Sequence, residues 1–145
     1  MTTSALARGG EELPDWHTLM AAFGGAFGNG GAVGEHPVTV CAGGLARVHQ
    51  SARRSAVPDR RRAQLVEAID AWAAEHVRSP ERVGSLGAYV DRMAAAAAKA
   101  HQVLRSSAPM DEAVHTAFAD VAELAAGWTD ITSAVPPLIY TGADR

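Results

Sequence analysis

Residues 86–105, LGAYVDRMAAAAAKAHQVLR, carry the pattern that decides the fold. Apolar side chains recur in this segment at intervals of three and four residues, at Leu86, Val90, Met93, Ala97, Ala100 and Leu104. This spacing places all of them on one side of an α-helix, and an apolar stripe of this kind must be covered by other helices. The segment therefore predicts one helix of a helical bundle.

The same helical period appears in four other segments. We expect a short helix from Pro14 or Asp15 to Phe23, and longer helices over about 36–55, 59–77 and 110–135. Prolines and polar residues separate these segments, and none of them alternates like a β-strand. The sequence predicts an all-α fold, a four-helix-bundle-like domain with a short extra N-terminal helix and a glycine-rich loop.

Glycines mark the expected boundaries within the chain. Six of them, between Gly24 and Gly34, favour a flexible loop that ends the first helix early. We expect a disordered lead-in over 1–13, a short helix and loop over 14–35, the bundle over 36–137 and a tail over 138–145. The pair Gly43 and Gly44 indicates either close packing of two helices or an interruption of the second helix.

The composition limits the classes of function. The 145 residues are 48% hydrophobic, which is enough for a single core, and the net charge of −3 provides no overall attraction for nucleic acid or an anionic membrane. No apolar stretch approaches the ~20 residues of a membrane span, and residues 1–14 carry acids where a signal peptide needs an apolar core. We expect a cytoplasmic protein with no nucleic-acid or membrane partner.

Cysteine and histidine usage predicts neither a metal nor a cofactor. Cys41 is the only cysteine, and the six histidines lack the spacing of known zinc motifs. His49, His101 and His115 are expected at an interface or at the edges of the core. Cys41 lies on an apolar helical face without a neighbouring cation, which is typical of a structural thiol.

Four stretches carry a resemblance to a known family. They are HP at 36–37 leading into LARVH at 45–49, DRRRAQLVEAIDAW at 59–72, LGAYVDRMA at 86–94 and VAELAAGWTDI at 121–131. In this order they resemble the bacterial domain-of-unknown-function family 4254, over about residues 36–135. The resemblance implies a helical fold and a setting near natural-product biosynthesis in GC-rich bacteria, but it implies no activity.

The chain departs from that family at one position. Family members often place a His-Thr-Glu triplet before the Leu-Gly pair, whereas Val83, Gly84 and Ser85 precede Leu86 here. If the triplet has a chemical role in other members, this chain lacks it. The departure favours a binding or scaffolding role.

Arginines and carboxylates supply the candidate anion-binding and catalytic residues. The first turn of the third helix contains Arg60, Arg61 and Arg62, where cations oppose the helix dipole. These arginines form either a solvated charge cluster or an anion site.

A second group of charged residues adjoins the apolar stripes: Asp70, Asp91, Asp130 and Arg92. One interpretation is an ion pair of Arg92 with Asp70 or Asp130. The other is a polar pocket in which Arg92 binds an anion and a carboxylate acts as base.

Two functional hypotheses follow. The first is a small accessory subunit that acts through another protein chain or as a homodimer in a bacterial specialised-metabolite pathway, with Trp128, Leu138 and Tyr140 at the interface. The alternative is an enzyme, or part of one, that holds an anionic substrate or leaving group through arginines and performs elimination or cyclisation with a carboxylate base.

Overall fold

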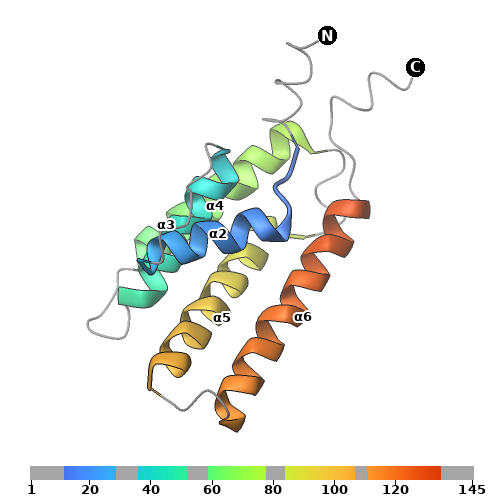
Figure 1. Ribbon diagram of the computed structural model, residues 1–145. Helices are drawn as coiled ribbons and strands as arrows, with labels where there is room; N and C mark the ends of the chain where they lie inside the picture. Colours follow the sequence, from blue (N-terminus) through green and yellow to red (C-terminus); the bar gives the residue numbers. More distant parts are fainter. Residues whose placement is uncertain (1–11, 29–35, 52–58, 78–83, 107–110, 135–145) are drawn as a thin grey trace.

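The structure is a computed structural model that describes residues 12–28, 36–51, 59–77, 84–106 and 111–134. These residues form five helices (Figure 1): α2 (Trp16–Ala26), α3 (Pro37–Ser51), α4 (Asp59–His76), α5 (Leu86–Ser106) and α6 (Glu112–Ala134). The described residues contain no β-strand. The predicted all-α, bundle-like fold is confirmed.

Helix α5, which holds the stripe that decides the fold, packs against more of the other helices than any other element does. It contacts α3, α4 and α6 and, over a narrower region, α2. Helix α3 also packs on α2 and α4. Helix α6 lies alongside α5 at one edge, and α2 crosses the other helices at a steep angle (Figure 1).

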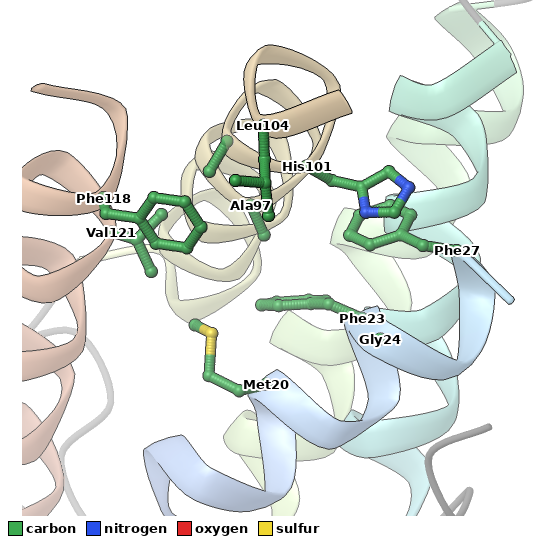
Figure 2. Close-up of a pocket in the computed structure, with 10 residues that line it drawn as sticks. Met20, Phe23, Gly24, Phe27, Ala97, His101, Leu104, Phe118 and Val121 are labelled. Atoms are coloured by element: carbon green, nitrogen blue, oxygen red, sulfur yellow. The ribbon is translucent and has the colours of Figure 1, made fainter. Parts of the chain in front are cut away.

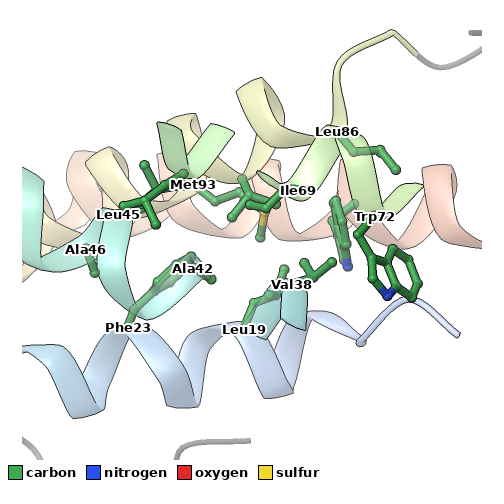
Figure 3. Close-up of a cluster of buried hydrophobic side chains, with 14 of the residues drawn as sticks. Leu19, Phe23, Val38, Ala42, Leu45, Ala46, Ile69, Trp72, Leu86 and Met93 are labelled. Atoms are coloured by element: carbon green, nitrogen blue, oxygen red, sulfur yellow. The ribbon is translucent and has the colours of Figure 1, made fainter. Parts of the chain in front are cut away.

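A single hydrophobic core joins these helices (Figure 3). Its most buried members include Leu19 and Phe23 of α2, Leu45 of α3, Ile69 of α4 and Met93 of α5, each at most 1% exposed. Burial on this scale supplies the main stabilising free energy of a small domain. Helix α2 therefore shares the core of the helices that follow it, although the sequence placed it outside the bundle.

The start of α2 agrees with the sequence, but its end does not. Asp15 caps the helix by accepting a hydrogen bond from the Thr18 amide at 2.9 Å. The helix then continues through Gly24 and Gly25 to Ala26, past the predicted end at Phe23. Burial of Phe23 against the core outweighs the low helix propensity of the two glycines. The remaining glycine-rich residues, 29–35, lie outside the described part of the chain.

Glycines inside the helices mark close approaches of helix pairs. Helix α3 is continuous, and a methyl group on Gly44 would lie 3.1 Å from a methyl carbon of Leu65 in α4. Close packing is therefore the correct alternative for this part of α3. At Gly87 in α5 the approach is tighter still, because a methyl group would overlap the carbonyl oxygen of Val66 in α4.

Candidate functional site

Asp91 of α5 is the one buried charged residue in the described part of the chain, with 6% of its surface exposed. Its Oδ1 atom lies 2.7 Å from Nε2 of His49 in α3. Its Oδ2 atom accepts a hydrogen bond of 3.0 Å from Nε of Arg62 in α4. We call these three side chains the Asp91 cluster. The cluster joins three helices, and it pairs a carboxylate that would otherwise be costly to bury.

The hydrogen bonds of the Asp91 cluster determine what each group presents to a ligand. A carboxylate only accepts hydrogen bonds, so the bonding pattern assigns a proton to Nε2 of His49. In the neutral ring, Nδ1 is then a hydrogen-bond acceptor. A carboxylate that orients an imidazole in this way is also found where a histidine serves as general base.

The Asp91 cluster corrects the predicted catalytic roles. Arg62 and Asp91 were both candidate site residues, and the structure brings them together. Asp91 was a candidate base, but both of its oxygens already accept hydrogen bonds from partners in the chain. The remaining acceptor in the cluster is Nδ1 of a neutral His49, a residue that the sequence placed at an interface or at the edge of the core.

Asp70 has a structural role at the start of α5. Its carboxylate accepts hydrogen bonds from the Gly87 amide at 2.8 Å and from the Ser85 hydroxyl at 2.7 Å. The Ser85 hydroxyl oxygen in turn accepts a hydrogen bond from the Ala88 amide at 2.9 Å. Asp70 therefore fastens the N-terminal turn of α5 to α4. The predicted ion pair between Asp70 and Arg92 is wrong.

Arg92 contacts an aromatic ring instead of a carboxylate. Its guanidinium carbon lies 4.9 Å from the centre of the Tyr89 ring, a cation–π geometry. Burial raises the pKa of the Tyr89 hydroxyl, and the charge of Arg92 opposes that shift. The hydroxyl donates a hydrogen bond of 2.8 Å to the Leu124 carbonyl in α6. Asp130 is exposed and, among the described residues, forms no ion pair with Arg92.

The other two arginines of the triplet remain at the surface. Arg60 and Arg61 are exposed on α4, and only Arg62 pairs with Asp91. Burial raises the pKa of the Cys41 thiol, and the charge of Arg61 lowers it by a smaller amount. The prediction that Cys41 lacks a neighbouring cation did not include this charge. Burial remains the larger effect on the pKa, and it favours the uncharged thiol.

The three predicted interface residues lie in different parts of the chain. Trp128 is completely buried, and its indole nitrogen donates a hydrogen bond of 2.8 Å to the Pro14 carbonyl. It is a core residue of this chain and not a contact for a partner. Leu138 and Tyr140 lie outside the described residues.

An apolar groove lies where α2, α5 and α6 meet (Figure 2). We call it the α2/α5/α6 groove; its volume is about 190 Å³, and its lining includes Met20, Phe23, Phe27, Leu104, Phe118 and Val121. Leu104 and Phe118 are 43% and 44% exposed. The sequence predicted Leu104 on the buried stripe of its helix. The structure buries Ala117 and leaves Leu104 and Phe118 at the groove.

A cluster of two histidines and a tryptophan, His36, Trp72 and His76, lies at the start of α3. The His36 ring packs edge-on against Trp72, and His76 stacks on the same indole. Nδ1 of His36 accepts a hydrogen bond of 3.1 Å from the Val38 amide, which requires this nitrogen to be unprotonated. Burial lowers the pKa of His36, and the charge of His76 lowers it further, while the backbone of Glu12 raises it.

This lowered pKa of His36 predicts a pH dependence of stability. A base whose pKa is lower in the folded state contributes stability above its unfolded pKa, about 6.5, and loses it as pH falls toward the folded value. We expect the free energy of unfolding, measured with urea, to decrease below about pH 6.5. In His36→Asn, which keeps a capping side chain, the decrease should be smaller; an unchanged decrease would assign it to other groups.

Comparison with protein-family models, with curated proteins and with solved structures finds no match to this chain. In the described part of the chain, no helix is long and apolar enough to cross a membrane. The same residues include no group of three or more histidine, cysteine or acidic side chains placed to hold a metal ion.

Proposed function

We propose that this chain is a small helical accessory subunit that acts by binding another protein, and that an apolar helix of that protein occupies the α2/α5/α6 groove. The observation that carries the proposal is the exposure of Leu104 and Phe118 beside an apolar hollow. Burying the part of such a side chain that is still exposed contributes about 1 kcal/mol. Large apolar side chains that share one exposed site are typical of protein-binding surfaces.

The chemistry of the groove favours an uncharged, apolar occupant. Helix α2 contains no acidic residue, lysine or arginine, so one whole side of the groove has no charged side chain to pair with. The other two sides contribute apolar residues and His101, whose ring stacks on Phe27 at 4.8 Å. An amphipathic helix that inserts large apolar side chains between helices is the recurring ligand of such grooves.

The biological setting in this proposal comes from the family resemblance. We propose that the subunit acts in the cytoplasm of a bacterium, within a pathway of specialised metabolism. Its partner would then be one of the enzymes of that pathway. The missing His-Thr-Glu triplet supports a binding role over a catalytic one.

The proposal is tested by co-expressing a tagged copy with the products of the adjacent genes and determining the stoichiometry of the purified complex by native mass spectrometry. Phe118→Asp places a charge in the groove at an exposed position. The variant should therefore fold, and its affinity for the partner should decrease by at least about tenfold. Val40→Asp is the matched control, because Val40 is 50% exposed on α3, which does not line the groove. This variant should keep the partner.

Two results would contradict the proposal. One is recovery of the chain as a monomer with every neighbouring gene product. The other is equal loss of the partner in Phe118→Asp and Val40→Asp, because the surface of binding would then not be the groove. A homodimer that only Phe118→Asp dissociates would assign the groove to a second copy of the chain.

A further inference from the structure

The second feature that points to a ligand is the Asp91 cluster, which does not belong to the groove. The buried carboxylate of Asp91 uses one oxygen for His49 and the other for Arg62. Burying a charge network rarely stabilises a protein more than well-packed apolar side chains would. The cluster does, however, bring an imidazole and a guanidinium to one carboxylate, and each is held there by a hydrogen bond, as in a preorganised binding site.

The two outer groups of the Asp91 cluster keep unused hydrogen-bonding capacity. Arg62 donates only its Nε–H group to Asp91, so its terminal nitrogens make no hydrogen bond with the described residues. Its side chain is 48% exposed. His49 uses Nε2 for Asp91, and its Nδ1 atom has no hydrogen-bond partner among the described residues. Nδ1 is also not one of the buried unpaired atoms.

The unused donors and the unused acceptor define the chemistry of a ligand. Four N–H bonds at the end of a guanidinium match the oxygens of a carboxylate or phosphate. In its neutral form the imidazole of His49 accepts a hydrogen bond at Nδ1, and this form matches a hydroxyl group. His49 and Arg62 bond to the two oxygens of one carboxylate, so the two side chains lie at the same site.

We infer that the Asp91 cluster is a binding site for a small molecule that carries an anionic oxygen group with a hydroxyl beside it. Arg62 binds the anionic group, and Nδ1 of His49 accepts the hydrogen bond of the hydroxyl. Asp91 is a positioning residue, since it orients both side chains and does not contact the ligand. The exposed Arg60 and Arg61 on α4 add positive charge near the site.

Glycolate, acetate and inorganic phosphate test this inference on the full chain. Glycolate and phosphate carry both groups, whereas acetate lacks the hydroxyl. Each is titrated into the protein at neutral pH, and binding is followed by the NMR signals of the His49 ring and of backbone amides in α3 and α4. We expect saturable shifts, with glycolate binding about tenfold more tightly than acetate, which corresponds to one added hydrogen bond.

Three variants separate the two contacts from a general effect of charge. Arg62→Gln should weaken glycolate and acetate by at least about tenfold each, and the chain should fold because Arg62 is half-exposed. His49→Gln retains an N–H donor for Asp91 but lacks the imidazole, so the advantage of glycolate over acetate should disappear. Arg105→Gln, in the last turn of α5, is the control and should change neither affinity.

The outcomes are distinct. Tighter binding of phosphate than of glycolate would identify the ligand class as a phosphate compound, and the reverse order would identify a hydroxy acid. The inference is overturned if none of the three anions shifts the His49 signals at millimolar concentration, if Arg105→Gln weakens binding as much as Arg62→Gln, or if His49→Gln keeps the preference for glycolate. None of these results bears on the groove, because Arg62 does not line it.

Discussion

Replacing Trp128 with alanine is expected to lower the free energy of unfolding by about 3–5 kcal/mol. Trp128 has the largest of the fully buried side chains, and its removal opens a cavity beside Tyr89, whose ring centre lies 6.0 Å from that of the indole. The substitution also leaves the Pro14 carbonyl without its hydrogen bond. A loss of this size is a large part of the total stability of a small domain, so the variant should be poorly folded.

Equilibrium unfolding in urea measures this loss, and Trp16→Ala is the matched control. Trp16 is 36% exposed at the start of α2, so the same substitution there removes less buried surface and should cost less than Trp128→Ala. Trp128→Phe should lie between the two, because it keeps one aromatic ring in the core but loses the rest of the indole together with its N–H donor. Equal losses for Trp16→Ala and Trp128→Ala would contradict the buried position of Trp128.

The second large effect is expected at Gly87. Its substitution by alanine places a methyl group against the carbonyl oxygen of Val66, which belongs to the backbone of α4. A backbone carbonyl cannot rotate away as a side chain can, so α4 and α5 must separate and lose core contacts. We expect Gly87→Ala to destabilise the fold by about 2–4 kcal/mol, despite the higher helix propensity of alanine.

Gly43→Ala is the matched control for Gly87→Ala. A methyl group on Gly43 would lie 3.6 Å from the carbonyl oxygen of Ala22, an ordinary contact distance. The gain in helix propensity should then dominate, and the variant should be as stable as the natural chain or up to about 1 kcal/mol more stable. Thermal or urea unfolding of both variants measures the two changes in stability. A stabilising Gly87→Ala would show that α4 and α5 do not approach as closely as described.

The helices could be predicted from the sequence because their apolar period and their capping residues act locally. Asp15 was expected near the start of the first helix, and it caps α2. The end of α2 could not be predicted in the same way. It depends on the burial of Phe23, which is a tertiary contact that overrides the glycine signal.

The Asp91 cluster could be predicted only in part. The sequence indicated that a charge beside the stripe of α5 must be paired, and Asp91 is paired. It could not identify the partners, since His49 and Arg62 are 42 and 29 residues away and meet Asp91 only when three helices pack. The groove was missed for a similar reason. The helical period leaves Ala117 and Phe118 nearly equivalent, and only the position of α5 decides which of them is buried.

The most direct test of the proposed docking role is hydrogen–deuterium exchange of the chain, alone and in complex with the partner that co-purifies with it. We expect slower exchange in the complex at the C-terminal half of α2, the last turns of α5 and the first half of α6, the segments that line the α2/α5/α6 groove. Protection confined to α3 and α4, with these segments unchanged, would contradict it.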